Sequence, residues 1–324
     1  MQYLPLENVD KKASRLVFGT GTAKVTGNDR EAAFACLDTA FAAGITIFDT
    51  AHSYGNAETH LGQWMQARGN REQVIVLDKG CNPGQRGSED QMTPDCIRKQ
   101  LDTSLQRLHT EYTDLYILHR DDLSVPVGPI VETLNELKVA GKIRRFGGSN
   151  WKRSRIQEAN EYAKLHGLEG FTAVSPCYSL TEQLGDPWGG SVCLAGEAGK
   201  EDREWYRLQK MPVFAYSALA RGFLSGRYRT DGKRPIEDCL SLAPIQEYYY
   251  PVNVARLRRA EQLAQQKGRS VAQICLAWLL NQPLAVYPII SPSTPDHLAE
   301  NAEALELTLT KEDCDYLEKG PIQQ

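Results

Sequence analysis

The sequence predicts an α/β protein with the (β/α)8 TIM-barrel fold, built as a single domain over residues 1–324. Short apolar, β-rich runs alternate with helical patterns along the whole chain, and this alternation indicates βαβ units and a parallel sheet. Eight such runs occur, the number that closes a barrel of this kind. A hydrophobic content of 41% over 324 residues permits one large α/β domain or two ordinary ones, and the sequence contains no linker or low-complexity tract.

Each predicted strand is a short run rich in apolar or β-branched residues. The eight runs are Leu16–Phe18, Ile45–Phe48, Val74–Leu77, Leu115–Leu118, Ile143–Phe146, Phe171–Val174, Val213–Ala215 and Val286–Ile290.

Apolar residues at helical spacing predict helices between these strands, as in REAAFACLDTAFAAG. In TPDCIRKQLDTSLQRL, Thr93 is placed as the N-cap and Pro94 at the first helical position. NVARLRRAEQLAQQKG ends at Gly268, in the position that commonly follows a helix.

Two long segments interrupt the regular alternation. Residues 181–205 form a Gly-rich insertion after the sixth predicted strand, and residues 224–250 form another loop after the seventh. In a barrel both would lie at the C-terminal face, and long loops there commonly carry function.

Composition excludes several classes of partner. The net charge is −4 and the pI is about 5.9, which gives no electrostatic footprint for nucleic acid or an acidic membrane surface. The first fifteen residues, MQYLPLENVDKKASR, have no apolar h-region, and no stretch approaches the roughly 20 apolar residues of a spanning helix. We therefore expect a soluble, cytoplasmic protein that acts on a small molecule; the sequence sets no oligomeric state.

The eight cysteines and six histidines show no metal-binding spacing. No C-x-x-C pair occurs, and His52 and His60 lie eight residues apart, which matches no zinc signature. A disulfide framework is a poor interpretation of so long a chain without a signal peptide. We expect reduced, mostly buried thiols and no metal.

Polar residues occupy the C-terminal ends of successive predicted strands. They are Asp49, Lys79, His119, Ser149 with Asn150, Ser175 and Tyr216. Alone, a lysine at a strand end is usually solvated and a histidine there is usually a hydrogen-bonded core residue. Together they place polar groups on one rim of the barrel, where barrel enzymes have their active sites.

A tyrosine beside this rim suggests proton transfer. A free phenol has a pKa near ~10, so it is a slow acid at neutral pH. A lysine ammonium next to Tyr54 favours the phenolate and lowers that pKa, while an aspartate keeps the lysine charged. A neighbouring imidazole can orient a substrate oxygen, an arrangement suited to protonating a carbonyl oxygen as hydride reaches its carbon.

The motifs GITIFDTAHSYGNAETHLG, LDKG, ILHRDD, GGSN, YSALARGFLSG and STPDHLAEN, in this order, resemble those of the aldo-keto reductase family. The resemblance extends from about Gly19 to Asn301. It implies an NAD(P)-dependent oxidoreductase that reduces an aldehyde or ketone, with Tyr54 as the general acid, Asp49 and Lys79 tuning it, and His119 orienting the carbonyl.

The family binds an extended nicotinamide dinucleotide across the barrel mouth without a Rossmann domain, so the resemblance implies NADP or NAD as cofactor. Ser149 and Asn150 match the carboxamide contacts, and Tyr216 matches the residue that stacks on the nicotinamide ring. The other matching positions are Gly19 and Thr20 near the nicotinamide, Ser217, Leu219, Arg221 and Gly222 at the pyrophosphate, and Ser291, Ser293, His297 and Asn301 in the closing motif.

The closing motif also makes physical sense alone. Thr294 is a suitable N-cap with Pro295 at the first helical position, and a helix N-terminus just beyond a barrel strand can receive a phosphate. Ordinary capping would leave the same signature.

Three departures from the family pattern bear on the cofactor. Members that prefer NADP usually carry Arg or Lys in the closing motif, where this chain has Ser291, Ser293 and His297, so NAD use is credible. Ser175 stands where the family usually has a carboxamide-binding Gln. Ala218 replaces a common proline, with little expected consequence.

Trp151 and Trp188 are candidate substrate residues, because aromatic faces at a polar mouth suit sugars and ring carbonyls. The same side chains could instead hold the loops in place.

Several alternatives stay open. FGTGTAK has the G-x-G of a Rossmann fingerprint, but Lys24 stands at the third glycine position. A Schiff-base lyase would need a lowered pKa at Lys79, which Asp49 opposes. An NAD-dependent sugar or polyol dehydrogenase working oxidatively, and a cofactor-sensing regulatory subunit with weak turnover, both fit the same residues.

Overall fold

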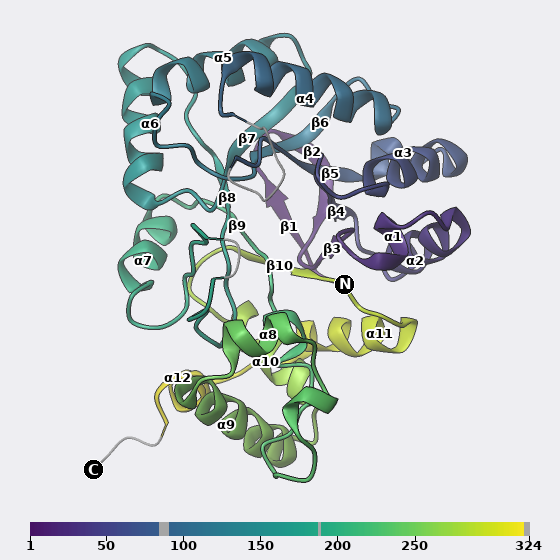
Figure 1. Ribbon diagram of the computed structural model, residues 1–324, viewed down its shortest axis with the longest axis vertical. Helices are drawn as coiled ribbons and strands as arrows, with labels where there is room; N and C mark the ends of the chain where they lie inside the picture. The colour runs from purple at the N-terminus through teal and green to yellow at the C-terminus, as the bar shows by residue number, and fades with distance from the viewer. Residues whose placement is uncertain (84–90, 187–188, 321–324) are drawn as a thin grey trace. The chain divides into compact units, whose positions relative to one another are not determined.

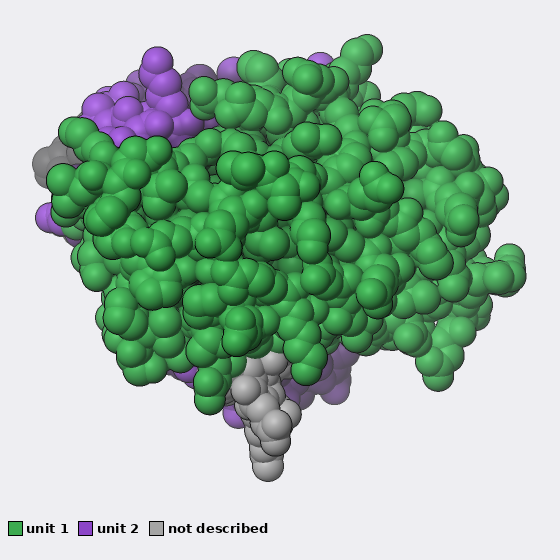
Figure 2. Space-filling model, turned by 90° about the horizontal axis from the view of Figure 1, so that it is seen from above, with its two compact units in different colours: residues 1–175 green, residues 176–324 purple. Residues whose placement is uncertain are grey.

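The computed structural model describes residues 1–83, 91–186 and 189–320 of the chain. The described chain falls into two compact units, Met1–Ser175 and Pro176–Gln324, which Figure 2 colours green and purple.

The elements of the first unit are β1 (Tyr3–Leu6), β2 (Val9–Ser14), β3 (Val17–Gly19), α1 (Ala23–Thr26), α2 (Arg30–Ala42), β4 (Ile47–Asp49), α3 (Ala57–Arg68), η1 (Arg71–Gln73), β5 (Ile75–Gly80), α4 (Pro94–Arg107), β6 (Thr113–Leu118), α5 (Val127–Val139), β7 (Ile143–Ser149), α6 (Arg153–Leu165) and β8 (Ala173–Ser175). Those of the second are α7 (Lys200–Leu208), β9 (Val213–Ala215), η2 (Ala220–Gly222), η3 (Ile236–Asp238), α8 (Leu242–Tyr248), α9 (Pro251–Lys267), α10 (Val271–Leu280), β10 (Val286–Ile290), α11 (Pro295–Glu303), η4 (Ala304–Glu306) and α12 (Lys311–Lys319).

Eight parallel strands close into a barrel in the order β10-β3-β4-β5-β6-β7-β8-β9, which confirms the predicted (β/α)8 fold. A closed barrel also excludes the open sheet of the Rossmann alternative. Every residue of β5 and β6 is buried, because core side chains cover one face of these strands and helices the other. In the first unit α3, α4, α5 and α6 form a layer outside the strands (Figure 1).

Each predicted strand overlaps an observed barrel strand, and the differences lie mainly at the strand ends. β9 and β10 have the predicted bounds. The prediction ended five other strands too early: β3 continues to Gly19, β4 to Asp49, β5 to Gly80, β7 to Ser149 and β8 to Ser175. Each prediction stopped at the end of the apolar run, yet backbone pairing continues through the polar residues that follow. The strand ends that carry the predicted site residues are therefore part of the sheet itself.

An N-terminal hairpin was not predicted. β1 and β2 pair antiparallel with Tyr3 opposite Ser14 and Leu6 opposite Val9, and Asn8 takes a positive φ of 59° in the turn. Asparagine tolerates this left-handed conformation. The strands are short and half polar, so they show little apolar alternation.

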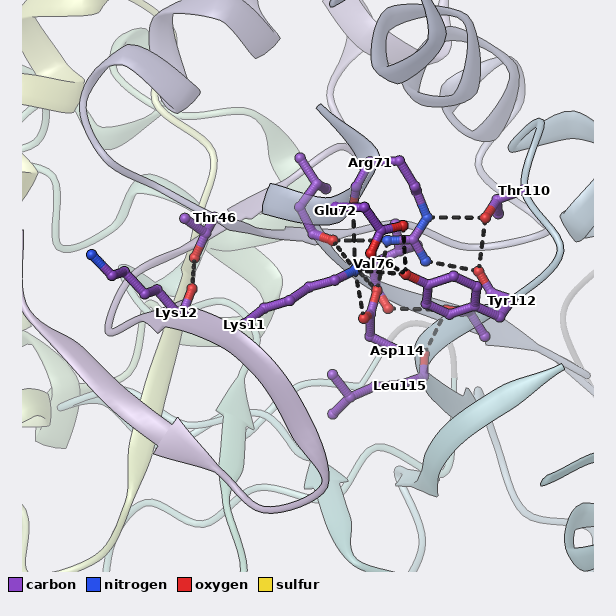
Figure 3. A network of polar contacts seen from close by, with 12 residues as sticks. Lys11, Lys12, Thr46, Arg71, Glu72, Val76, Thr110, Tyr112, Asp114 and Leu115 are labelled. Carbon is purple, nitrogen blue, oxygen red and sulfur yellow. Dashed lines mark hydrogen bonds and ion pairs between the residues drawn. The ribbon is translucent and has the colours of Figure 1, made fainter. Parts of the chain in front are cut away.

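The hairpin is tied to the start of β6 by a polar network (Figure 3). The Asp114 carboxylate pairs with Lys11 Nζ at 2.8 Å and with Arg71 Nη1 at 3.0 Å, and it accepts a hydrogen bond from the Val76 amide at 2.9 Å. Only 2% of the Asp114 side-chain surface is exposed. Buried charges of this kind persist because they are paired. The network lies at the opposite end of β6 from His119.

The predicted helix ends are confirmed. Thr93 Oγ1 accepts from Cys96 N at the start of α4, and Thr294 Oγ1 accepts from His297 N at the start of α11. Gly268 follows α9 with φ of 61°, a conformation that costs glycine little.

The two segments predicted as long loops contain helices. α7 begins at Lys200 and turns so that Tyr206 is buried, and the second segment contains η3 and α8. Their glycines and scattered apolar residues hide this helical structure from a periodicity argument.

Candidate active site

An ion pair between Lys79 and Asp49 lies at the base of the site. Asp49 is the last residue of β4, and Lys79 is the penultimate residue of the neighbouring strand β5. The side chain of Lys79 is only 2% exposed, and that of Asp49 is 5% exposed. Lys79 Nζ donates to an Asp49 carboxylate oxygen and to the carbonyl oxygen of Thr50, 3.2 Å away.

These contacts keep the lysine charged. Burial lowers the pKa of Lys79, but Asp49, Tyr54 and Asp78 together outweigh burial and raise it above its ordinary value. Burial likewise raises the pKa of Asp49 while Lys79 lowers it. We assign the ammonium–carboxylate state, because Lys79 Nζ has two oxygen acceptors. A raised lysine pKa is the opposite of what the Schiff-base alternative needs.

Tyr54 is presented by a tight turn between β4 and α3. The His52 amide donates to the Lys79 carbonyl at 2.8 Å, and the Tyr54 amide donates to the Ala51 carbonyl at 2.9 Å. Gly55 has φ of 53°, and a Cβ there would lie 2.8 Å from the carbonyl oxygen of Thr26. Position 55 therefore requires glycine, both for its conformation and for its space.

The turn brings the phenol to the other predicted residues. Lys79 Nζ lies 5.0 Å from the centre of the Tyr54 ring. The His119 ring packs edge-on against Tyr54 with ring centres 5.7 Å apart. The four residues Asp49, Tyr54, Lys79 and His119 thus lie together in the first unit.

The net pKa of Tyr54 differs from the expectation. Burial among protein atoms raises the pKa and outweighs Lys79, whose charge and hydrogen bond lower it; Asp49 raises it further. The side chain nevertheless keeps part of its surface exposed. The phenol is therefore protonated at neutral pH, the form that a proton donor needs.

His119 directly follows β6, and its amide donates to the Gly80 carbonyl at 2.8 Å. Burial, together with the charges of Lys79 and Arg120, holds the pKa of His119 well below its usual range. Its Nδ1 is buried without a hydrogen-bond partner within the described ranges. A neutral imidazole can direct one N–H at a substrate oxygen.

Ser149 ends β7, and Asn150 follows with φ of 58°. Ser149 Oγ donates to the Ser175 carbonyl at 2.7 Å, and Asn150 Nδ2 donates to Ser149 Oγ at 3.2 Å. Asn150 Nδ2 also reaches the His119 carbonyl at 3.4 Å. The ends of β6, β7 and β8 are thereby joined side by side.

The turn after β3 completes this part of the site. Gly19 pairs with Asp49 across β3 and β4, and Thr20 donates to the Asp49 carbonyl through both its amide and its hydroxyl, each at 2.9 Å.

Trp151 occupies a different environment from the one a substrate residue needs. It is 1% exposed and packs on Phe171 with ring centres 4.8 Å apart. This burial favours the alternative that it holds the local fold. Trp188 lies outside the described residues.

In the second unit, the segment after β9 has an unusual backbone. Ser217, Ala220 and Arg221 have φ between 48° and 53°, and Gly222 has φ of 97°. Leu219 initiates η2, and Arg221 Nε lies 3.5 Å from Glu247 Oε1. Within the segment the Ala220 amide donates to the Ser217 carbonyl at 2.7 Å, and the Gly222 amide donates to the Leu219 carbonyl at 2.9 Å. Turns with positive φ of this kind can direct the other N–H groups at an anion such as phosphate. Tyr216 precedes the segment, partly exposed.

The closing motif forms the N-terminal end of α11. Ser293 Oγ and His297 Nδ1 are 2.9 Å apart, and both residues are exposed, as is Ser291. Asn301 is buried in the last part of the helix. α11 carries Asp296, Glu300 and Glu303 and has no lysine or arginine of its own.

Sequence reasoning missed two contributors. A Cβ on Gly21 would lie 3.2 Å from Tyr54 Cε2, so the turn after β3 runs directly beside the phenol ring. The G-x-G of FGTGTAK, which fails as a Rossmann fingerprint, is the sequence signal for this close approach. Arg120 is the second, through its effect on the pKa of His119.

In the described part of the chain, no group of three or more His, Cys, Asp or Glu could hold a metal ion. Among the same residues, no helix has the length and apolar character needed to cross a membrane.

The arrangement supports proton transfer to an oxygen atom. It offers a protonated phenol as donor, a neutral imidazole beside it, and a buried cation whose charge stabilises the phenolate that forms.

Comparison with known proteins gives matches over nearly the whole chain. The model of the Aldo/keto reductase family matches residues 15–320. Norsolorinic acid reductase B of Aspergillus parasiticus is 28% identical over 322 residues, which cover 94% of this chain and 78% of that protein. Aldo-keto reductase YhdN of Bacillus subtilis is 27% identical, and the match covers 97% of this chain and 91% of that protein. Uncharacterized oxidoreductase YrpG of the same organism is 30% identical, and the match covers 96% of this chain and 93% of that protein.

Proposed function

Because this chain belongs to the aldo/keto reductase family, we propose that it reduces an aldehyde or ketone to an alcohol, with Tyr54 as the proton donor. The family and its oxidoreductase relatives make the chain an NAD(P)H-dependent oxidoreductase. The observation that carries the finer proposal is the protonated Tyr54 phenol packed between the Lys79–Asp49 ion pair and a neutral His119.

Each residue has a separate task in this mechanism. Tyr54 donates its phenolic proton to the carbonyl oxygen, and His119 directs an N–H at the same oxygen and orients it. Lys79 stabilises the phenolate that remains, and Asp49 keeps Lys79 charged and in place. The nicotinamide cofactor supplies the hydride when it is bound.

Separate segments of the chain carry groups that suit parts of such a cofactor. Ser149 and Asn150 carry polar groups for a carboxamide, the left-handed segment at 217–222 suits a pyrophosphate, and the Thr294-capped end of α11 suits a further phosphate. We assign NAD rather than NADP as the preferred form, because the acidic residues of α11 and the neutral Ser291 and Ser293 that precede it offer no lysine or arginine to a 2′-phosphate.

With its raised pKa, Tyr54 holds at neutral pH the protonated form that reduction uses. Reduction requires the protonated phenol, whereas alcohol oxidation requires the phenolate as base. The NAD preference is the one feature that favours the alternative, a sugar or polyol dehydrogenase. Rates measured in both directions across pH separate the two: oxidation should rise as pH approaches the tyrosine pKa, and reduction should fall.

Tyr54→Phe tests the mechanism. We expect loss of carbonyl reduction, followed by nicotinamide absorbance with a panel of aldehydes, ketones and sugars, with the NADH dissociation constant nearly unchanged. Tyr162→Phe, on the exposed face of α6, is the matched control and should keep full activity. An equal loss of cofactor binding in Tyr54→Phe would make the tyrosine structural. No turnover by wild type in either direction with either cofactor would favour a sensing subunit.

A further inference from the structure

Cys177 and Cys193 face each other across a short parallel bridge in the second unit. The Cys177 amide donates to the Val192 carbonyl at 2.8 Å, and the Leu194 amide donates to the Cys177 carbonyl at 2.9 Å. Directly paired residues on neighbouring strands are about 4.8 Å apart, within the roughly 4.4–6.8 Å between Cα atoms that a disulfide spans. Both cysteines carry free thiols in this structure.

The two thiols have different surroundings. Cys177 is fully buried, with its sulfur 3.4 Å from the Tyr248 hydroxyl, whereas Cys193 is partly exposed. The Gln183 amide donates to Cys193 Sγ at 3.5 Å. A hydrogen bond from the Cys177 thiol lowers the pKa of Cys193 to about 7, and the same contact raises the pKa of Cys177 well above its usual value. A partly exposed thiolate is the reactive form of cysteine.

We propose that Cys193 and Cys177 are a reversible disulfide site, with Cys193 as the nucleophile toward hydrogen peroxide and Cys177 as the resolving thiol. The Cys193 thiolate attacks one peroxide oxygen and displaces hydroxide, which gives a sulfenic acid at Cys193. The Cys177 thiol then attacks that sulfur, an S–S bond forms, and water leaves. The two thiols lose two electrons and two protons in total, and one peroxide takes them up to become two waters.

The disulfide acts on a residue that the proposed function uses. Cys177 is also bridged to Tyr216: the Tyr216 amide donates to the Pro176 carbonyl at 3.1 Å, and the Tyr178 amide donates to the Tyr216 carbonyl at 3.3 Å. Drawing Cys177 toward Cys193 therefore pulls on the backbone that holds Tyr216. This consequence rests on the proposed role of Tyr216 at the nicotinamide ring, whereas the thiol chemistry does not.

A mass measurement tests the thiol chemistry without any activity assay. Residues 165–200 form one tryptic peptide that contains both cysteines and no others. After treatment of the folded protein with one equivalent of hydrogen peroxide and blocking of free thiols, this peptide should be lighter by two hydrogens and unblocked. Dithiothreitol should restore both thiols. Cys81 and Cys96, whose sulfurs are 3.9 Å apart, lie in other tryptic peptides and are scored separately.

Two variants assign the roles of the sulfurs. Cys177→Ala should accumulate a sulfenic acid at Cys193 that a 1,3-diketone probe traps, and Cys193→Ser should leave Cys177 unmodified. Cys36→Ser, on α2 of the first unit, is the matched control and should form the disulfide like wild type. A peptide that keeps both thiols in wild type, or a probe adduct at Cys177 before Cys193, would overturn the proposal.

Cofactor titration then tests the link to Tyr216. The oxidised protein should bind NADH several-fold more weakly than the reduced protein, and dithiothreitol should reverse this change. Cys193→Ser treated with peroxide should show no change. A disulfide with an unaltered NADH dissociation constant would overturn the link to the cofactor, and failure of any form to bind NADH would instead count against the proposed function.

Discussion

The protonation states of single residues in the candidate site are set by the contacts that the fold gives them. Lys79 and Asp49 are charged because they are paired. Tyr54 is neutral because burial raises its pKa, and His119 is neutral because burial and the nearby positive charges lower its pKa. The sequence could predict which side chains meet, since each closes a strand or its following turn. It could not predict the net pKa of Tyr54, because that depends on how densely the turn is packed.

The neutral state of His119 gives a pH-dependent stability. The folded pKa lies well below the unfolded value of about 6.5, so below pH 6.5 the unfolded chain binds a proton that the folded chain does not. Stability from this residue is therefore present at high pH and is lost as pH falls through 6.5. Between pH 8 and pH 5.5, wild type should lose about 1 kcal/mol more than His119→Gln in urea unfolding. Equal losses would mean that the imidazole is protonated in the folded protein.

Elements place these residues by continuing their backbone pairing beyond the apolar run. β4, β5 and β7 each end with polar residues that are still part of the sheet, which fixes Asp49, Lys79 and Ser149 rigidly. A strand prediction based on hydrophobicity ends where the apolar run ends. It therefore finds the end of the barrel that carries the polar residues, but it places the strand ends too early. The hairpin of β1 and β2 was missed for the related reason that its stabilising contacts are ionic.

The network that ties this hairpin to β6 should matter for stability and not for catalysis. Asp114→Asn leaves Lys11 and Arg71 without their shared carboxylate, and removal of one partner from a buried ion pair costs about 3–5 kcal/mol. We expect a loss near the lower value in urea unfolding, with unchanged activity per folded molecule. Glu72→Gln, at an exposed member of the same network (Figure 3), should change stability by less than about 0.5 kcal/mol. Similar effects of both changes would show that Asp114 is not the centre of the network.

α11 offers a direct test of cofactor preference. Ser293 is exposed beside the capped N-terminus, and the helix has no cation of its own. Ser293→Arg introduces a charge-assisted partner for a 2′-phosphate and should lower the NADPH dissociation constant about tenfold with little effect on NADH. Ser293→Gln, of similar length and neutral, is the control. A wild-type protein that already binds NADPH much more tightly than NADH would contradict the assignment.

At the scale of the whole molecule, most of the architecture follows from one repeated pattern. Eight apolar runs alternating with helices predict a barrel, and the closed parallel sheet confirms it. The single-domain boundary of residues 1–324 stays a prediction, because the described chain forms two compact units. The pairing of the two thiols could not be predicted from the sequence. Cys177 and Cys193 are separated by a Gly-rich segment without periodicity, and the backbone bridge brings them together.

Cofactor binding should also raise the stability of the folded protein, and this gain can be measured without a known substrate. A ligand that binds only the folded state at a hundred times its dissociation constant adds about 2.7 kcal/mol, which for a chain of this length is about 4 °C in the midpoint of thermal unfolding. NADH at that concentration should give this shift, and NADPH at the same concentration a smaller one, since α11 has no cation for the extra phosphate. Ser293→Arg should bring the NADPH shift up to that of NADH, because the added charge acts only on the 2′-phosphate. A larger shift with NADPH in wild type would mean that a basic residue outside α11 reaches that phosphate, and the cofactor assignment would then reverse.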